Sequence, residues 1–274
     1  MARSPVRRGE LPRARKRFGQ HFLRDASVLQ DIADALGPIG DRTVVEIGPG
    51  RGALTDLLAE RAERLIAIEI DRDLAAHLRV RYATRTNVEI VEADVLTLPL
   101  GDVAGDDFVL AGNVPYYITT PILFHALEAP RPELAVYLVQ REVAIRMAAP
   151  PGDKTYGALS VNLQALAHVE LVREVPPGAF SPPPTVDSAV VRVRPRAESA
   201  VPPDLEKKYR GVVIAAFGLR RKQLVRVVRT IAALDAPAAE AIVERAGLRP
   251  DARPETLSPE DFARLVVELA RVAP

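Results

Sequence analysis

The sequence contains no cysteine, which excludes disulfides, thiolate zinc sites and cysteine nucleophiles. It also has no internal repeat, no low-complexity tract and no apolar run near the roughly 20 residues that a membrane helix needs. The first residues are basic, but they lack the apolar segment of a secretory signal. These absences predict a cytoplasmic protein that does not associate with membranes.

What is present is the composition of a globular protein: 274 residues, 48% of them hydrophobic, with a net charge of +1. This length suits one large domain, or one large and one small domain. The charge is unevenly distributed, since residues 1–17 hold seven Arg or Lys against one acid, and residues 206–229 hold eight against one. Two basic segments favour a polyanionic partner such as nucleic acid. A solvated tail and an ordinary charged helix face are the alternatives.

Short β-branched runs alternate with helical patterns over the first two thirds of the chain. This alternation predicts right-handed crossovers and a mostly parallel, doubly wound α/β sheet. No helical pattern separates the last two runs, so we expect an antiparallel hairpin at one edge. The expected strands are residues 43–48, 64–70, 88–94, 108–113, 134–140, 169–175 and 188–195.

Strand patterns stop after a segment rich in proline and polar residues, 195–204, which is typical of a linker. The rest of the chain is helical by period, and its last helix is expected to begin with Ser258 as N-cap and Pro259 in the first turn. The sequence therefore predicts a sheet domain over residues 1–195, with a basic arm at 1–17, and a small all-helical domain over residues 196–274.

A glycine-rich loop follows the first expected strand, with Gly48, Gly50 and Gly52 at alternate positions before a helix. Glycines at such a turn allow a ligand to approach the backbone closely, and the following helix N-terminus offers free N–H groups. The loop also fits the dinucleotide fingerprint. By itself it indicates a nucleotide-like cofactor, with a simple tight turn as the alternative.

Acids end the next two expected strands. Glu69 is placed to accept hydrogen bonds from two vicinal ribose hydroxyls, which NAD and S-adenosylmethionine both possess. Asp94 is placed to accept from an adenine amino group, although a lone acid at a strand end is commonly a turn or cap residue. Three consecutive strand ends with this chemistry make a stronger indication than any one of them.

The fourth strand end reads Asn113-Val114-Pro115-Tyr116. Pro115 favours an extended Val114 and so fixes where its carbonyl points. The Asn113 oxygen and the Val114 carbonyl could accept the two N–H groups of a base amine and favour the partly cationic nitrogen that forms during methyl transfer. Tyr116 offers a flat face to an unstacked base. Hydride transfer needs none of this, so a methyltransferase is favoured over a dinucleotide enzyme, with a proline turn and core tyrosines as the alternative.

On these residues the chain resembles the ribosomal RNA adenine N6-dimethyltransferases, specifically the bacterial small-subunit (KsgA) type. The resemblance covers nearly the whole chain, and the order and spacing of its segments make it specific. The segments are "RFGQHFL", "EIGPGRGALT", "EID", "EADVL", "NVPYYITTPIL", "QREVAIRMAAPPGDKTYGALSVNLQ", "PPGAFSPPPTVDSAVVRVRP", "AAFGLRRKQL" and "RPETLSPEDFARLV".

The resemblance implies a Rossmann-like S-adenosylmethionine-dependent methyltransferase that needs no metal. It would act as a monomer on two adjacent adenosines in a hairpin near the 3′ end of 16S ribosomal RNA in the small subunit. It assigns cofactor binding to His21, Leu23, Gly48, Gly50, Gly52, Glu69, Asp94 and Asn113. It assigns catalysis to Asn113, Val114, Pro115 and Tyr116, with Phe180 covering the other face of the base, and RNA binding to Arg220, Arg221 and Lys222. We expect these three cations on the exposed face of a helix.

The chain departs from the family pattern at Tyr117, where relatives often carry a smaller or polar residue, and at Val225-Arg226, where an Asn is common nearby. The N-terminal arm is also rich in arginine. Two alternatives remain at this stage. One is the large-subunit (23S) dimethyltransferase of antibiotic resistance, which shares the active site, and the other is a non-catalytic RNA-binding assembly or transcription factor on the same scaffold.

Overall fold

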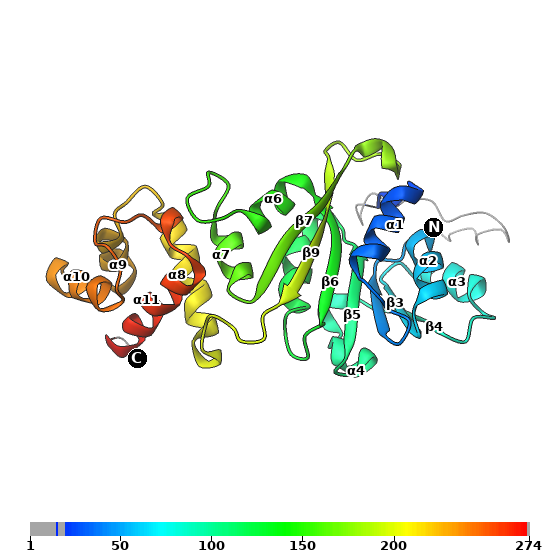
Figure 1. Cartoon of the computed structure of the whole chain (residues 1–274), viewed down its shortest axis with the longest axis horizontal. Coiled ribbons are helices and arrows are strands. Elements are labelled where there is room, and N and C mark those ends of the chain that lie inside the picture. Colours follow the sequence, from blue (N-terminus) through cyan, green and yellow to red (C-terminus); the bar gives the residue numbers. More distant parts are fainter. Residues whose placement is uncertain (1–14, 16–19, 273–274) are drawn as a thin grey trace, which may run out of the picture. The chain divides into compact units, whose positions relative to one another are not determined.

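The computed structural model describes Arg15 and residues 20–272. Most of the basic arm, and residues 17–19 of the "RFGQHFL" segment, lie outside the described residues. The chain forms two compact units (Figure 1). The first extends to Ala144 and also contains residues 170–195, and the second contains residues 145–169 and 196 onward. The predicted division after residue 195 coincides with one of these boundaries, while residues 145–169 pack with the C-terminal helices.

A seven-stranded sheet has the order β4-β3-β2-β5-β6-β9-β7. Strands β2 to β6 pair in parallel, and β9 is antiparallel to β6. The predicted parallel-rich α/β fold is therefore confirmed. Strands β2, β3, β5 and β6 are buried along most of their length, because helices cover both faces, and this explains their continuous apolar runs. The strands of this sheet are β2 (Thr43–Ile47), β3 (Arg64–Glu69), β4 (Val88–Glu92), β5 (Phe108–Asn113), β6 (Leu134–Gln140), β7 (Ala167–Val175) and β9 (Ser188–Pro195).

Helices connect the strands of the first unit, and two of them begin with a side-chain cap. Asp25 accepts from the backbone N–H groups of Ser27 and Val28, and Asp71 accepts from that of Asp73, so each supplies partners that the helix start lacks. The helices are α1 (Ala26–Ala35), α2 (Ala53–Arg61), α3 (Arg72–Arg81), α4 (Leu100–Ala104), α5 (Thr119–His125) and α6 (Arg141–Ala148), with 3₁₀ turns η2 (Val95–Thr97), η3 (Tyr116–Ile118) and η4 (Pro177–Ala179).

A second, two-stranded sheet joins distant parts of the first unit. Strand β1 (Phe22–Leu23) pairs antiparallel with β8 (Phe180–Ser181), and Leu23 lies opposite Phe180. The backbone N–H of Arg24 also donates to the Ala179 carbonyl at 2.9 Å. These bonds fix residues 22–24 beside β8, near the carboxyl ends of the parallel strands of the large sheet.

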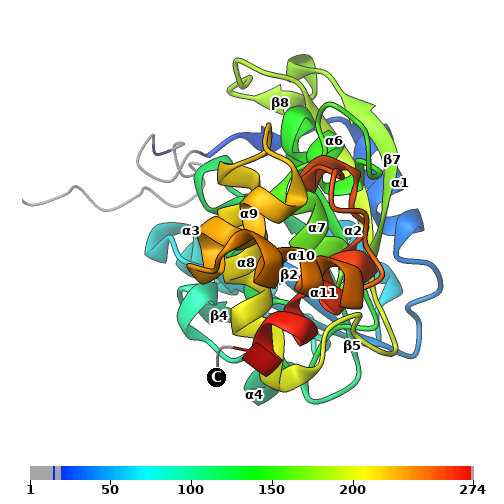
Figure 2. The same cartoon turned by 90° about the vertical axis from the view of Figure 1, so that its left-hand side faces the viewer.

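The second unit is built from helices around one apolar cluster. Its helices are α7 (Ala158–Gln164), α8 (Glu206–Gly218), α9 (Leu224–Ala232), α10 (Ala236–Arg245) and α11 (Pro259–Val272), with 3₁₀ turns η5 (Pro203–Leu205) and η6 (Pro254–Thr256) (Figure 2). Ser258 and Asp261 cap α11 reciprocally, since each side chain accepts from the other's backbone N–H at 2.9–3.0 Å. The predicted start of this helix is confirmed.

Residues 145–169 belong to the second unit because its core and its hydrogen bonds include them. Tyr156 is fully buried, and its hydroxyl donates to the Leu257 carbonyl at 2.8 Å. The Gly152 N–H donates to the Glu255 carbonyl at 2.7 Å. Contacts between residues a hundred positions apart have no signature in local sequence patterns.

The segment "RRK" does not lie on a helix, and that prediction is wrong. Helix α8 ends at Gly218, and residues 219–223 form a turn in which the Lys222 N–H donates to the Leu219 carbonyl at 2.8 Å. The Leu224 N–H then donates to the Ala252 carbonyl at 2.8 Å, which sets α9 in a new direction. The sequence keeps a helical period through residues 219–223, but the hydrogen bond from Leu224 to Ala252 favours a turn there.

Candidate active site

An open pocket of about 780 Å³ lies at the carboxyl ends of β2, β3, β4 and β5. Parallel strands bring their carboxyl ends to one edge of a sheet, and ligands of such folds bind there. The lining residues are Gln20, His21, Phe22, Ile47, Gly48, Gly50, Ile68, Glu69, Ile70, Ala93, Asp94, Val95, Asn113, Val114, Pro115, Tyr116, Tyr117, Ile118 and Ile122.

The glycine loop forms one wall of this pocket. Gly48 and Gly50 have φ values of +70° and +59°, which other residues rarely adopt, and both line the pocket. A Cβ on Gly50 would meet the Phe22 ring at 2.9 Å, so the loop passes close to β1. Gly52, at φ +87°, does not line the pocket, because it faces Tyr82 and supports the loop from behind.

Glu69 lies at the end of β3 and is only 4% exposed. One carboxylate oxygen accepts from the Gly50 N–H at 3.1 Å and the other from the Asp71 N–H at 2.8 Å. Burial raises the pKa of Glu69 to about 7, against the opposing effect of these backbone bonds, and the Asp71 charge raises it further. A carboxylate fixed at both oxygens still has acceptor capacity for hydroxyl groups in the pocket.

Asp94, just after β4, is a cap residue that also lines the pocket. It is the N-cap of η2, where one carboxylate oxygen accepts from the Leu96 N–H at 3.0 Å. The cap bond fixes the carboxylate at the rim without using all of its acceptor capacity.

Asn113 ends β5 and contacts the chain segment before β1. Its amide nitrogen donates to the His21 carbonyl at 3.0 Å. This bond orients the side chain, so that the amide oxygen is directed away from His21 and can accept from a ligand. The buried backbone of Val114 and the extended Pro115 continue this wall of the pocket.

Tyr116 is held by two contacts. Its hydroxyl shares a hydrogen bond with Ser188 at 2.6 Å, and its ring stacks on the His21 ring at 6.0 Å between centroids with planes 20° apart. His21 Nδ1 donates to the Pro182 carbonyl at 2.9 Å. Burial raises the pKa of the Tyr116 hydroxyl, which stays protonated near neutral pH. The tyrosine ring is therefore positioned before any ligand arrives.

Tyr117 has a different environment from the other tyrosines. Tyr82, Tyr137, Tyr156 and Tyr209 are buried, whereas Tyr117 is 61% exposed and lines the pocket. Tyr117 therefore places a second flat ring at the pocket mouth.

Besides Gly52, two predicted residues do not line this pocket. Phe180 is 1% exposed and packs in the core of the first unit, because β8 pairs with β1 and turns the ring inward. The expectation that Phe180 covers a base is therefore not met in this structure. Leu23, opposite Phe180, lines a smaller neighbouring cavity beside the glycine loop.

Glu46, inside β2, is a residue that the sequence analysis missed. It is 2% exposed, lines the smaller cavity, and one of its oxygens has no hydrogen-bond partner among the described residues. Burial raises its pKa to about 8, and the neighbouring Glu69 contributes to this rise. An acid within an otherwise apolar strand was the signal available in the sequence.

These two raised pKa values predict a pH-dependent stability. A carboxyl whose folded pKa exceeds its unfolded value stabilises the fold fully below the unfolded pKa, near 4.5, and this contribution is lost as pH rises through the folded pKa. The free energy of unfolding should therefore fall between about pH 5 and 8 by more in the wild type than in Glu46→Gln. Denaturant titrations at several pH values measure this difference, and His77, whose pKa is lowered, contributes equally to both proteins. Parallel pH profiles for the two would contradict the assignment.

The three predicted RNA-binding residues differ in their surroundings. Arg220 donates twice to the Lys154 carbonyl at 3.2 Å and its Nε is 3.7 Å from Glu255, so it is engaged within the second unit. Arg221 and Lys222 are exposed. Lys222 also lines a groove with Arg226 and Arg229 of α9, two cations that the sequence analysis did not assign.

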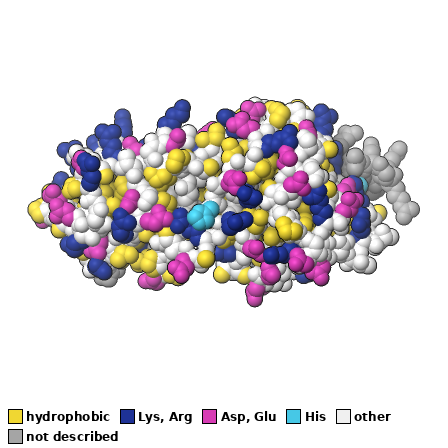
Figure 3. Space-filling model, viewed as in Figure 1, with side chains coloured by type: hydrophobic (Ala, Val, Ile, Leu, Met, Phe, Trp, Pro, Cys, Tyr) yellow, Lys and Arg dark blue, Asp and Glu magenta, His cyan; other side chains and the backbone are white. Residues whose placement is uncertain are grey.

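Helix α9 presents these cations because its two sides differ. Leu224, Val227 and Val228 are buried against the apolar cluster, which turns Arg226 and Arg229 to the surface. In Figure 3, several Lys and Arg side chains are seen along the upper edge of the left-hand end of the view, with Asp and Glu side chains among them. No ion pair of Lys222, Arg226 or Arg229 occurs within the described part of the chain.

Arg15 and residues 20–272 contain no group of three or more His, Cys, Asp and Glu that could hold a metal ion. No helix in this part of the chain is long and apolar enough to span a membrane.

Comparisons with known proteins agree with this geometry. Residues 12–271 match the family model described as "Ribosomal RNA adenine dimethylase". Proteins named "Ribosomal RNA small subunit methyltransferase A" are similar over nearly their full length: that of Koribacter versatilis is 42% identical over 99% of this chain and 100% of the relative, and that of Xanthomonas campestris pv. campestris (strain B100) is 46% identical over 94% and 97%.

Two solved structures also resemble the chain. The 23S rRNA methyltransferase ErmE is 32% identical with a TM-score of 0.72, covering 91% of this chain and 99% of its own. A dimethyladenosine transferase from Plasmodium falciparum is 26% identical with a TM-score of 0.78, covering 92% and 98%.

Proposed function

Because this chain belongs to the ribosomal RNA adenine dimethylase family, we propose that it transfers methyl groups from S-adenosylmethionine to N6 of two adjacent adenosines in a hairpin near the 3′ end of 16S ribosomal RNA. The observation that carries the chemistry is the single pocket lined by Glu69, Asp94 and residues 113–116. Relatives at 42–46% identity are named for the small subunit, whereas the 23S enzyme is 32% identical, which favours the small-subunit substrate.

The residues of the pocket suit the methyl donor. Glu69 presents fixed acceptors to a ribose diol, and Asp94 presents one to an adenine amino group. Gly50 allows the loop to lie close against Phe22 at the pocket wall, because a Cβ at this position would meet the Phe22 ring at 2.9 Å. S-adenosylmethionine supplies an electrophilic sulfonium methyl group when bound, and the chain's own contribution is to hold donor and base together.

The remaining residues suit an extruded adenine. The Asn113 oxygen and the Val114 carbonyl accept the two N–H groups of N6 and thereby favour a pyramidal, partly cationic nitrogen. Tyr116, held by His21 and Ser188, stacks on the base. Tyr117, beside it, offers a second stacking face at the entrance. Water accepts the surplus proton, so the reaction needs no base with a tuned pKa.

The second unit, in this proposal, binds ribosomal RNA. Lys222, Arg226 and Arg229 line a groove without a neighbouring acid in its lining, which suits phosphate oxygens. Arg221 is exposed in the adjoining turn. The monomeric state and the cytoplasmic location stay predictions.

Replacing Lys222, Arg226 and Arg229 by Ala is expected to weaken RNA binding and to lower the slope of log K against log salt by about 2 to 3, roughly one for each lost phosphate contact. Filter binding of ribosomal RNA at several salt concentrations measures the slope. Arg220→Ala is the matched control, because Arg220 bonds to the Lys154 carbonyl, and it should lower the melting temperature with little effect on the slope. An unchanged slope in the triple variant would remove the groove from the interface.

The experiment that tests the proposed function is methylation of purified small and large ribosomal subunits side by side with a radiolabelled donor. We expect label on two adjacent adenosines near the 3′ end of 16S RNA. Label confined to the large subunit would favour the antibiotic-resistance activity. Tight RNA binding with no transfer to either subunit would favour a non-catalytic assembly factor.

A further inference from the structure

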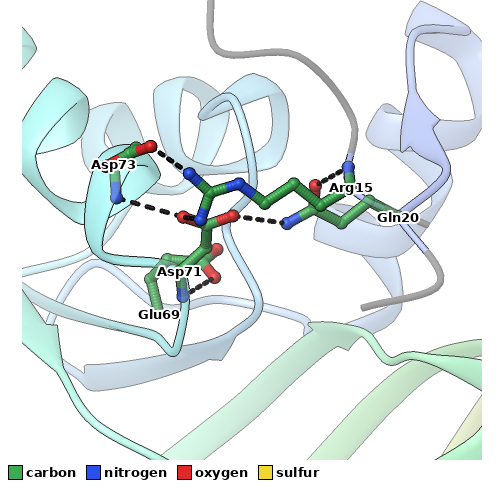
Figure 4. Close-up of polar contacts among 5 residues, drawn as sticks. All are labelled: Arg15, Gln20, Glu69, Asp71 and Asp73. Atoms are coloured by element: carbon green, nitrogen blue, oxygen red, sulfur yellow. Dashed lines mark hydrogen bonds and ion pairs between the residues drawn. The ribbon is translucent and has the colours of Figure 1, made fainter. Parts of the chain in front are cut away.

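Arg15, in the basic arm, is engaged by two acids rather than exposed to solvent. Its Nη1 donates to Asp71 Oδ1 at 2.7 Å, and its Nη2 donates to Asp73 (Figure 4). The Asp71 side chain is 2% exposed and that of Arg15 is 22% exposed. The guanidinium therefore bridges two carboxylates at the turn that joins β3 to α3, and both of its terminal nitrogens are used.

Gln20 adds a second link between the arm and this turn. Its side-chain oxygen accepts from the Arg15 backbone N–H at 2.8 Å, and its amide nitrogen donates to the other Asp71 oxygen at 3.3 Å. Figure 4 shows Arg15 and Gln20 reaching Asp71 from the same side. Gln20 lines the pocket, as do His21 and Phe22 after it.

Asp71 connects these contacts to the donor site. Its backbone N–H donates to Glu69 Oε1 at 2.8 Å, and its side chain caps α3 through the Asp73 N–H at 3.0 Å. Three acids within five residues repel one another, and the Asp71 charge is one of the causes that raise the pKa of Glu69. The positive charge of Arg15 offsets this repulsion at Asp71 and Asp73.

We propose that Arg15 is a positioning residue of the donor pocket, acting through Asp71 on Glu69 and, through Gln20, on the segment that carries His21. This rests on the proposed function, since Glu69 is there assigned to the donor ribose. The composition of the arm favoured a contact with RNA, but the Arg15 fork already binds two carboxylates. Its role differs from that of a surface cation available to phosphate.

Calorimetric titration with S-adenosylhomocysteine tests this role. Arg15→Ala should raise the donor-site Kd on the order of tenfold, a typical coupling between groups in one hydrogen-bonded network. The donor KM should rise in parallel, while kcat at saturating donor and the Kd for ribosomal RNA stay near the wild-type values. Arg15→Lys should recover only part of the loss, because an ammonium cannot reproduce the two-pronged contact.

A double-mutant cycle with Asp71→Asn separates positioning from a general loss of structure. If Arg15 acts through Asp71, the double variant should bind the donor product about as weakly as the weaker single variant. Arg24→Ala is the matched control, since Arg24 lies in the same segment but donates to the Gly178 carbonyl. It should leave the Kd unchanged.

Other outcomes would overturn the inference. A donor Kd that is unchanged in Arg15→Ala would contradict the inference, whether or not RNA affinity is lost. A smaller dependence of RNA binding on salt in this variant would identify Arg15 as a phosphate contact instead. Strictly additive effects of Arg15→Ala and Asp71→Asn would contradict the pathway through Asp71. A wild-type protein that does not bind S-adenosylhomocysteine would refute the proposed function itself, which is a separate result.

Discussion

Asn113→Ala is expected to lower kcat by about 100- to 1,000-fold, the usual cost of removing one fixed dipole that stabilises a transition state. In the wild type, the Asn113 amide oxygen accepts from N6 most strongly when that nitrogen becomes partly cationic. Its loss should therefore lower kcat more than it weakens binding. The lost amide nitrogen also frees the His21 carbonyl, now 3.0 Å away, and a smaller loss of donor affinity follows. Single-turnover kinetics with saturating donor and RNA measure the chemical step.

Asn87→Ala is the matched control for this variant. Asn87 lies in the same unit, and its amide donates to the carbonyls of Ala59 and Ala62 at 2.9 and 3.1 Å. Its loss should lower the melting temperature and leave kcat near the wild-type value. A kcat that is the same in Asn113→Ala and the wild type would remove Asn113 from the catalytic step.

Glu69→Gln is expected to raise the Kd for S-adenosylhomocysteine by about 10- to 100-fold, because hydrogen bonds to charged groups contribute about 1.5–3 kcal/mol each. Glutamine keeps the size of the side chain but has only one oxygen. It therefore cannot accept from both the Gly50 and Asp71 N–H groups, which Glu69 does at 3.1 and 2.8 Å. At saturating donor the loss of kcat should be smaller than in Asn113→Ala. Calorimetry measures the affinity.

The wild-type affinity should also depend on pH. The pKa of Glu69 is raised to about 7 by burial, and a ribose diol prefers the ionised carboxylate as acceptor. Donor affinity is therefore expected to rise from pH 6 to pH 8 in the wild type, with a flatter profile in Glu69→Gln. Glu89→Gln is the control, since Glu89 forms an exposed ion pair with Arg64 and should change neither value. An unaltered Kd in Glu69→Gln would contradict the assignment of Glu69 to the ribose.

The parts of the fold and site that local patterns determine were predictable. Short β-branched runs located the strands, and the helical patterns between them implied parallel strands whose carboxyl ends meet at one edge. Glu69, Asp94 and Asn113 therefore fall in one pocket, as the sequence indicated. Ser258 begins the last helix because its side chain and that of Asp261 cap it locally.

What depends on distant contacts was not predictable. The inward direction of Phe180 follows from the pairing of β8 with β1, which are more than 150 residues apart in sequence. The turn at "RRK" depends on a bond between Leu224 and Ala252. The engagement of Arg15 by Asp71 could not be read from the arm, whose composition resembles that of a nucleic-acid-binding tail.

Glu46 illustrates a different limit. Its position in the strand expected at residues 43–48 was visible, but its burial and raised pKa depend on how β2 packs between β3 and β5. An acid inside an apolar run therefore marked Glu46 as unusual, but it did not indicate whether the carboxyl group is protonated.

A crystal structure of the chain with S-adenosylhomocysteine and a short RNA that contains the two adjacent adenosines would show directly whether donor and base share this pocket. We expect both ribose hydroxyls of the donor product on Glu69, its adenine beside Asp94, and N6 of one extruded adenosine within hydrogen-bond distance of Asn113 and the Val114 carbonyl. A donor product bound away from the glycine loop, or an adenosine that enters without approaching Asn113, would contradict this proposal.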